Sequence, residues 1–245
     1  MSWLEVKNIY KSFGKTEVLK GIDFSLEKGE GVALIGSSGS GKTTILSLIT
    51  RNYDIQKGQI LIDGINIKKY SLESLRNNIG IVLQDPFLYN KNIFDNVKIS
   101  APNKTKEEVY NATMMAHVHN DILNFDKKYE TLVGEKGVTL SGGQKQRLSI
   151  ARAIVKKPEI LIFDDASSAL DLVTEAKLYK AMRSYINDTT RIVVAQRVAT
   201  ARNADKIMVL DGGVIVDFDT HENLLKNCDV YQDIYNSQLK KEGDE

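Results

Sequence analysis

The sequence predicts an α/β fold in which a parallel-strand core carries an N-terminal antiparallel β subdomain and an inserted helical subdomain. Short apolar runs of strand length, such as 31–35, 79–83 and 160–163, indicate buried strands. A glycine-rich turn at 36–41 leads directly into a helical pattern. The stretch from about 85 to 156 holds most of the helical pattern and few strand signals, which favours a helical insert.

The elements follow in order. Residues 4–9 and 18–26 alternate apolar and polar positions, and turns at 14–15 and 28–31 follow them, so this region reads as antiparallel strands. The segment 43–49 reads as a helix, and 58–64 as a strand ending in a turn. We therefore expect an antiparallel β subdomain before the first buried core strands.

The rest of the chain returns to strands after the helical stretch. Helices are predicted at 106–119 and 142–155, and strands at 160–163, 191–195 and 206–210. Gly212-Gly213 predicts a hairpin, and 221–241 an amphipathic helix. We expect one domain over 1–245, with the core at about 1–84 and 157–245 and the helical subdomain at about 85–156.

The glycine-rich turn is the strongest functional signal. The pattern G-x-x-x-x-G-K-[ST] is matched by Gly36-Ser37-Ser38-Gly39-Ser40-Gly41-Lys42-Thr43, followed by Thr44. Glycines let backbone N–H groups face phosphates, Lys42 brings a positive charge, and Thr43 offers a hydroxyl to Mg²⁺. A chance Gly/Ser turn is the alternative, which the flanking strand and helix disfavour. The motif predicts that ATP binds here with Mg²⁺.

Asp164 is the expected acidic residue on the metal side. Four apolar residues, 160–163, precede it, so the carboxylate emerges at the carboxyl end of a buried strand. Such a residue holds Mg²⁺ through water in phosphoryl-transfer sites. A core strand that merely ends in aspartate is the alternative, and its pairing with the phosphate loop disfavours it.

A second glycine-rich helix start occurs at Leu140-Ser141-Gly142-Gly143-Gln144. A serine and two glycines there can form an anion-binding nest, although a serine cap with a glycine turn has the same pattern. One nucleotide rarely needs two such helix starts. We therefore expect Ser141, Gly142, Gly143 and Gln144 to serve a nucleotide held by a second chain.

Along the chain the three motifs come in the order 36–43, 140–144 and 160–164, and in that order they resemble the nucleotide-binding domain of an ATP-binding cassette (ABC) transporter, of the exporter branch. The resemblance covers essentially the whole chain and implies a P-loop NTPase (RecA-like) core. It also implies that two such domains pack head to tail around two ATP molecules. Each ATP then lies between the P-loop of one chain and the signature, 140–144 here, of the other.

The resemblance assigns further residues. Phe13 matches the aromatic residue that stacks on adenine, with Tyr10 a weaker candidate and a core phenylalanine the alternative. Gln84 matches the glutamine that reaches Mg²⁺ or the attacking water. The segment 168–171 matches the D-loop, and 83–94 matches the stretch that faces the coupling helices of a transmembrane domain.

Three positions depart from the family pattern. Asp165 stands where the family has the glutamate general base, Gln196 stands where it has histidine, and Leu132 replaces an acidic residue two positions before Gly134. Aspartate has a shorter reach, and glutamine is neutral at every pH. Since the signature is intact, the combination resembles one half of a heterodimeric exporter whose own site is degenerate. A backbone shift that keeps Asp165 working is the alternative.

Composition sets further limits. The net charge is +1, with 33 basic and 32 acidic residues, so a nucleic-acid partner is not expected. Cys228 is the only cysteine, which rules out an internal disulfide and indicates a reducing compartment. No apolar run approaches the ~20 residues of a membrane span. We expect a domain at the cytoplasmic face of the membrane, cut from the C-terminal part of a longer half-transporter.

The sequence therefore predicts an ABC-type ATPase that dimerises on ATP and drives transport. Its site residues are Lys42, Gln84, Asp165 and Gln196 for catalysis, and Thr43, Gln84 and Asp164 for Mg²⁺. The expected partners are a second, non-identical nucleotide-binding domain and the coupling helices. An importer ATPase subunit, a soluble ABC ATPase outside transport and a purely regulatory ATP-binding module are the alternatives.

Overall fold

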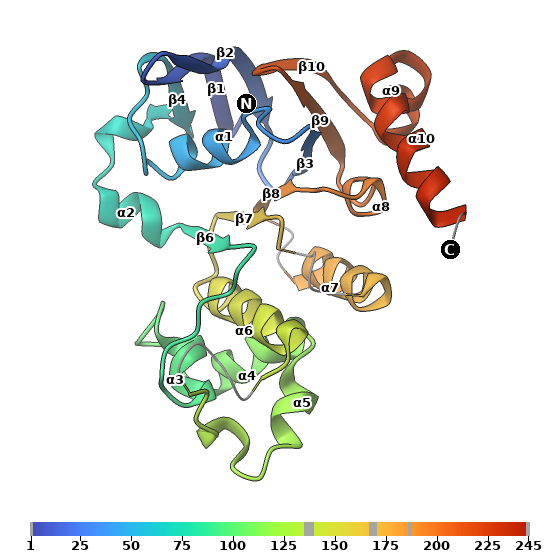
Figure 1. Ribbon diagram of the computed structural model, residues 1–245. Helices are drawn as coiled ribbons and strands as arrows, with labels where there is room; N and C mark the ends of the chain where they lie inside the picture. The colour runs from blue at the N-terminus through green and yellow to red at the C-terminus, as the bar shows by residue number, and fades with distance from the viewer. Residues whose placement is uncertain (1, 135–139, 167–170, 186–187, 244–245) are drawn as a thin grey trace. The chain divides into compact units, whose positions relative to one another are not determined.

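The computed structural model describes residues 2–134, 140–166, 171–185 and 188–243. The chain forms two compact units, the first made of Met1–Arg76 and Thr190–Glu245, the second of Asn77–Thr189. Figure 1 shows the helices and strands of both. Their bounds in chain order are β1 Leu4–Phe13, β2 Thr16–Leu26, β3 Gly31–Gly36, α1 Lys42–Ile49, β4 Lys57–Ile62, β5 Ile65–Asn66, η1 Ile67–Lys69, α2 Leu72–Asn77, β6 Ile79–Val82, α3 Ile93–Lys98, α4 Lys106–Met115, α5 His119–Leu123, η2 Lys128–Glu130, α6 Gly142–Ile154, β7 Ile160–Asp164, α7 Leu172–Tyr185, β8 Thr190–Val194, α8 Val198–Ala201, β9 Lys206–Asp211, β10 Val214–Asp219, α9 His221–Asn227 and α10 Asp229–Gly243.

An antiparallel sheet in the order β2-β1-β4-β5 forms one layer of the first unit. Leu4 of β1 lies opposite Leu26 of β2 and Ile62 of β4, and all three side chains are buried. Because side chains alternate between the faces of a strand, the apolar alternation places these residues on one buried face. The structure thus has the antiparallel β subdomain that the sequence predicts.

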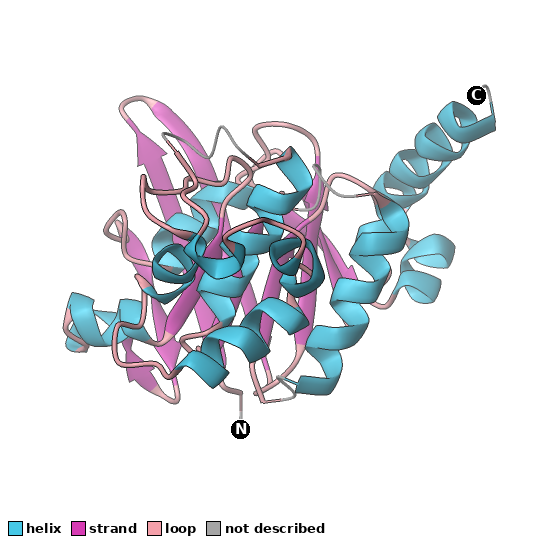
Figure 2. Cartoon of the chain, turned by 90° about the horizontal axis from the view of Figure 1, so that it is seen from below, coloured by secondary structure: helices cyan, strands magenta, loops and turns pink. Residues whose placement is uncertain are grey.

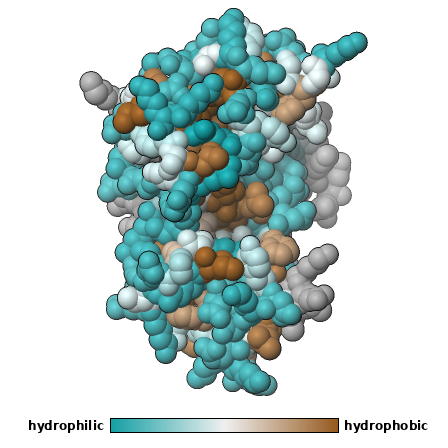
Figure 3. Space-filling model, turned by 90° about the vertical axis from the view of Figure 1, so that its left-hand side faces the viewer, coloured by the Kyte–Doolittle hydropathy of each residue, from teal (hydrophilic) through white to brown (hydrophobic). Residues whose placement is uncertain are grey.

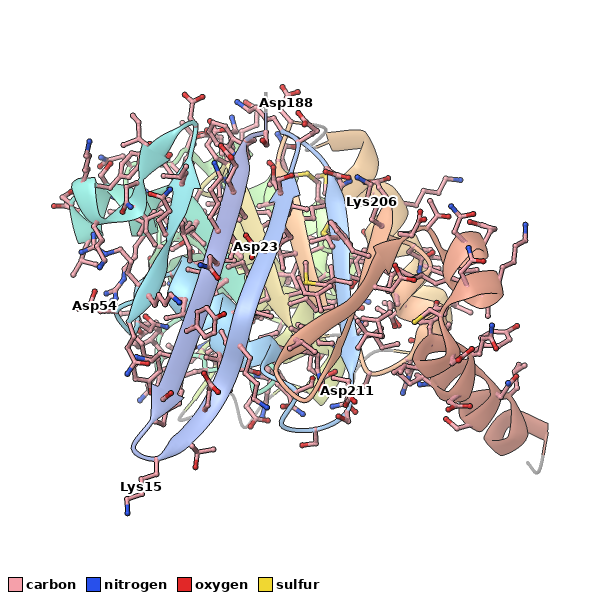
Figure 4. The ribbon with its side chains drawn as sticks, turned by 90° about the horizontal axis from the view of Figure 1, so that it is seen from above. Lys15, Asp23, Asp54, Asp188, Lys206 and Asp211 are labelled. Atoms are coloured by element: carbon pink, nitrogen blue, oxygen red, sulfur yellow. The ribbon has the colours of Figure 1, made fainter. Side chains whose placement is uncertain are left out.

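The core strands of the first unit centre on β3. This strand runs parallel to both β8 and β9, with Leu34 opposite Val194 and Gly36 opposite Leu210. Its residues are almost entirely buried, as expected for a parallel strand covered on both faces. Figure 4 labels Lys206 and Asp211 at the two ends of β9, after which the predicted glycine hairpin turns the chain into antiparallel β10.

The C-terminal segment is two helices, not the single helix predicted for 221–241. Cys228 separates α9 from α10 with an extended backbone, φ −115 and ψ 102. Leu224, Cys228 and Tyr231 are all buried in one cluster with Ile35 of β3. The break at Cys228 lets both helices turn an apolar face to this cluster. Figure 2 shows the longer of the two, α10, leading to the C-terminus.

In the second unit, parallel strands β6 and β7 pair closely, with Val82 opposite Phe163. Helix α6 contacts α3, α4 and β6. Gly80 permits this approach, because a Cβ there would lie 2.9 Å from Leu161 Cδ1 and 3.1 Å from the carbonyl oxygen of Ala153. The predicted helix over 106–119 is shorter than expected, since α4 ends at Met115 and His117 has a left-handed φ of 52.

The α/β fold class is therefore confirmed. Helices α3 to α6 fall within the stretch of about 85–156 that the sequence assigns to a helical subdomain. The exact limits of that subdomain stay a prediction. Among the described residues, no helix combines the length and apolarity needed to cross a membrane.

Candidate nucleotide-binding site

The loop between β3 and α1 has a backbone that requires glycine. Gly36, Gly39 and Gly41 have φ values of +152, +79 and +101. A Cβ on Gly36 would lie 2.0 Å from the carbonyl oxygen of Leu210, and one on Gly41 would lie 2.5 Å from Leu19 Cδ2. The contact at Gly36 is with backbone and leaves no room for a side chain, and the positive φ at both positions favours glycine, so the close turn depends on them.

The N-terminus of α1 is open to a ligand. Gly41 is the N-cap residue, and no side chain caps the helix. The first N–H groups of a helix have no partner within the helix, and they carry its positive dipole end. Ser37, Ser38 and Gly39 of the same loop are exposed. The loop therefore offers backbone N–H groups to an anion, as a phosphate-binding loop does.

Lys42 lies back along this loop. Its Nζ donates to the carbonyl oxygens of Gly36 at 2.8 Å and Ser37 at 2.7 Å, and to Ser40 Oγ at 3.1 Å. An ammonium group has three donors, which match these three acceptors. The loop thus holds the positive charge where phosphates would approach, while Thr43 is exposed and Thr44 partly exposed at the start of α1.

Two further polar residues of the first unit lie beside the loop. Ser37 Oγ donates to Asp211 Oδ1 at 3.2 Å, from the end of β9. The N–H of Ala195 donates to the carbonyl oxygen of Leu34 at 3.0 Å, so the chain leaving β8 runs beside β3 up to the loop. The exposed Gln196 follows Ala195 directly, and its role beside Gly36–Thr43 stays a prediction. The sequence did not predict Asp211 at this loop, because no motif or spacing in it links position 211 to Ser37.

Phe13 ends β1 as part of an exposed aromatic pair. Its ring is 5.1 Å from that of Tyr53, edge to face, and the two residues are 41% and 50% exposed. Lys11 Nζ lies 5.1 Å from the Phe13 ring and donates to the carbonyl oxygen of Asp54 at 3.0 Å. Phe13 is therefore not a core residue, and its ring is available for stacking. Its role with adenine stays a prediction.

In the second unit, Gln84 follows strand β6 and Asp164 is the last residue of the neighbouring strand β7. Val82 lies opposite Phe163 in the parallel pair β6–β7, so both residues lie at the same carboxyl edge. Asp165 is only 7% exposed, and its φ is +51. That left-handed backbone is rare outside glycine, but aspartate accepts it more readily than most residues. Asp165 is thus a buried carboxylate on a constrained backbone.

Ser141 caps α6 and forms a reciprocal capping box with Gln144. Ser141 Oγ accepts from the Gln144 N–H at 3.2 Å, and Gln144 Oε1 accepts from the Ser141 N–H at 3.0 Å. Gly142 is exposed, and a Cβ added there would have no neighbour within 4 Å. With Gly143 partly exposed, this helix start presents an accessible backbone surface. Residues 168–170 of the predicted D-loop lie outside the described residues.

Two polar residues of α6, missed in the sequence analysis, hold the chain after β6. Gln146 is fully buried and donates from Nε2 to the carbonyl oxygen of Leu83 at 3.2 Å. Arg152 donates to the carbonyl oxygens of Phe87 at 2.7 Å and Asn96 at 2.8 Å. The available signal was a polar residue at a buried position of the 142–155 pattern. Through these bonds α6 fixes the segment that contains Gln84.

Exposed apolar side chains flank this segment. Phe87 and Tyr89 are exposed and lie edge to face with ring centroids 5.0 Å apart. Leu132, 63% exposed, pairs with Asn92 in an antiparallel bridge. We call Leu83, Phe87, Tyr89 and Leu132 the apolar segment surface. Figure 3 shows one face of the molecule, on which hydrophobic residues in brown interrupt a mainly hydrophilic surface.

Comparison with known proteins identifies the family of these motifs. Residues 19–168 match the ABC transporter family. The chain is 48% identical over 221 residues to a protein of Staphylococcus aureus (strain NCTC 8325) that is provisionally named a multidrug export ATP-binding/permease protein, with 90% of this chain and 38% of the relative covered. YgaD of Bacillus subtilis (strain 168), with the same descriptive name, is 46% identical over 224 residues, covering 91% of this chain and 39% of the relative.

A solved structure agrees with this assignment. The structure of a bacterial Atm1-family ABC exporter with ATP bound superimposes with a TM-score of 0.92 at 38% sequence identity. The match covers 96% of this chain and 42% of that one. The chain therefore spans about two fifths of the length of these relatives.

Proposed function

The chain belongs to the ABC transporter family, and from this membership we propose that it is the ATP-binding domain of an exporter, which binds ATP with Mg²⁺ and uses its hydrolysis to drive transport. The observation that carries the proposal is the loop of Gly36–Thr43, which offers glycine-dependent backbone N–H groups and the Lys42 ammonium to phosphates. The relatives named above are exporters, so importer and soluble ABC functions are not favoured.

The roles of the residues follow from their chemistry. The Lys42 donors that bind Gly36, Ser37 and Ser40 suit phosphate oxygens equally well. Phe13 offers its exposed ring to adenine. Gln196 reaches the γ-phosphate as a neutral hydrogen-bond donor.

Mg²⁺ fits the available donors. Thr43, Gln84 and Asp164 present a hydroxyl, an amide oxygen and a carboxylate, which are the hard oxygen ligands this ion prefers. Mg²⁺ is commonly held by one or two carboxylates together with substrate phosphates and water, where it neutralises phosphate charge. Among the described residues there is no group of three or more His, Cys, Asp or Glu side chains that could hold a metal ion.

We further propose that turnover at this chain's own P-loop is slow. Asp165 has the charge of a general base but a shorter arm, and its buried position and left-handed backbone limit adjustment. Gln196 cannot share a positive charge as histidine can. ATP would then act here mainly to hold two domains together.

The signature at Leu140–Gln144 is proposed to complete the site of a second, non-identical nucleotide-binding domain. Support comes from Gly142, which is exposed with open space around it, and from the helix start that it shares with Ser141 and Gly143. Backbone N–H groups at such a start stabilise phosphate charge. The faster hydrolysis is proposed to occur at that site.

The apolar segment surface is the proposed contact with the coupling helices of a transmembrane domain. Leu132, where the family has an acidic residue, adds to this surface instead of supplying a carboxylate. Because Gln146 and Arg152 fix the same segment to α6, a movement there would be passed to the signature. This role places the domain at the cytoplasmic face of the membrane.

Titration with Mg-ATP and Mg-ADP, followed by phosphate release, tests the proposal. We expect micromolar to millimolar ATP binding by the chain alone, slow turnover, and faster turnover after addition of the partner domain. A chain that fails to bind ATP would refute the binding function. Ordinary turnover by the chain alone, abolished by D165A, would refute only the degenerate site.

A further inference from the structure

Gln238 of α10 holds the loop that carries Gln196. Its Nε2 donates to the carbonyl oxygen of Gln196 at 2.8 Å, and its Oε1 accepts from the N–H of Val198 at 2.8 Å. One side-chain amide therefore binds both sides of Arg197. Only this orientation of the amide pairs a donor with an acceptor at each end.

The contact fills a specific need of α8. This helix begins at Val198 after Arg197, which provides no side-chain cap. Arginine has no acceptor, whereas helix starts normally take an acceptor from Ser, Thr, Asp or Asn. Val198 is buried, so its N–H would be costly to leave unpaired. Gln238 supplies the missing acceptor from a distant helix.

The side chain of Gln238 is placed by a well-anchored helix. Tyr231 is fully buried, and Ile234 and Tyr235 pack partly buried against the same cluster. The spacing 231, 234, 235 and 238 marks one face of a helix. Tyr231 OH also hydrogen-bonds His221 Nδ1 at 2.8 Å. Gln238 thus continues the docked face of α10 and ends it with a polar group.

We propose that Gln238 is a positioning residue for recognition of the γ-phosphate. It fixes the backbone from which the Gln196 side chain leaves, one residue after Ala195 is hydrogen-bonded to Leu34 of the strand leading to the P-loop. The proposal rests on the proposed role of Gln196 at the γ-phosphate. It adds that the C-terminal helix sets the preference of this site for ATP over ADP.

Two variants and a matched control test this role. Q238M has a similar length and loses both hydrogen bonds. Q238E keeps an acceptor for Val198 but sets a carboxylate against the carbonyl oxygen of Gln196. The control is Q232M, because Gln232 lies on the same helix and donates to the carbonyl oxygen of Leu225 on α9 at 2.9 Å, away from the loop. The measurements are the affinities for Mg-ATP and Mg-ADP and the hydrogen exchange of the Val198 amide.

We expect the ATP-over-ADP preference to fall on the order of tenfold in both Gln238 variants, the scale of one weakened hydrogen bond to a charged group. Q232M should keep the wild-type preference. Exchange at Val198 should accelerate on the order of tenfold in Q238M alone, because only that variant removes its acceptor. A general loss of stability would lower both affinities together and would not give this pattern.

The outcomes separate this inference from the proposed function. Wild-type preference for ATP that persists in both Gln238 variants would overturn the positioning role and leave ATP binding intact. The same holds if Q232M loses the preference as much as Q238M does. If Q238M does not fold, the preference measured in Q238E decides. A wild-type chain that binds neither nucleotide overturns the proposed function itself.

Discussion

Restoring glutamate and histidine in the double variant D165E/Q196H should raise ATP turnover by this chain. The extra methylene of glutamate lengthens the arm at position 165 by roughly 1.5 Å. Misplacement of a catalytic group by about 1 Å can cost ~10²-fold in rate. We therefore expect about 10²-fold faster turnover from D165E, which corresponds to a barrier lower by about 2.7 kcal/mol. Q196H should add to this gain by sharing positive charge with the γ-phosphate.

The same substitution carries a cost in stability. Asp165 is 7% exposed and has a φ of +51, so the added methylene enters a buried site on a left-handed backbone. Overpacking typically costs about 1–3 kcal/mol. That is a fraction of the roughly 5–15 kcal/mol by which domains are stable, so the variant should still fold. The rate gain and the stability loss are separate observables, and each can be measured alone.

The assay is phosphate release under saturating Mg-ATP, with thermal unfolding followed in parallel. The chain suits this test because it contains both a P-loop and the signature 140–144, so two copies can complete each other's sites. K42A provides the background rate. The degenerate-site argument is wrong if D165E/Q196H binds ATP normally and turns over no faster than wild type. It is equally wrong if the wild-type chain already reaches the ordinary range of about 1–10³ s⁻¹.

Four further predictions address single contacts. K42A should weaken ATP binding by on the order of 10-fold or more in a titration, because it removes hydrogen bonds to charged oxygens; unchanged affinity would contradict the P-loop assignment. G36A should lower the unfolding midpoint in urea, since its Cβ would lie 2.0 Å from a carbonyl oxygen, and a wild-type midpoint would show that the loop can move aside. L132D should leave the free energy of unfolding within ~0.5 kcal/mol, because the side chain is exposed, but should reduce co-purification with the transmembrane domain; undiminished co-purification would count against that contact. Burial raises the pKa of Tyr231 to about 12 from near 10. The contribution of its protonated form to stability is therefore full below pH 10 and is lost as the pH rises through about 12. The free energy of unfolding in urea should fall less between pH 8 and pH 11.5 in Y231F than in the wild type.

The phosphate-binding loop could be predicted because its chemistry is local. Eight consecutive residues supply the turn, the charge and the hydroxyl, and the apolar patterns on either side predict the flanking strand and helix. Strands β6 and β7 were predictable for the same reason, together with the positions of Gln84 and Asp164 at their carboxyl ends. Contacts between distant segments gave no such pattern. Ser37 binds Asp211 across 174 positions, and neither residue marks the other in the sequence.

Helix α8 shows how a local pattern can still point to a distant partner. An arginine at its N-cap position leaves the Val198 N–H without a local acceptor, and in the structure this N–H donates to Gln238 Oε1, forty residues later. The missing acceptor can be recognised in the sequence only when the start of α8 is already known, because residues 197 and 198 alone do not indicate a helix start. The break at Cys228 has a similar cause, because Leu224 and Tyr231 both pack into the buried cluster. This packing is a tertiary contact, and the continuous amphipathic pattern of 221–241 does not predict it.

The backbone conformation at Asp165 gives a second physical reason for aspartate at this position. The sequence presents it only as a shorter arm than glutamate, which bears on rate. Its φ of +51 adds a local preference, since aspartate adopts left-handed conformations more readily than glutamate does. Once a site no longer needs a long base, aspartate relieves strain there at no functional cost. On this argument D165E should lower the free energy of unfolding even in a chain that also carries K42A, which cannot use the restored base. An equal free energy of unfolding in K42A and K42A/D165E would show that the strain does not depend on the residue at position 165.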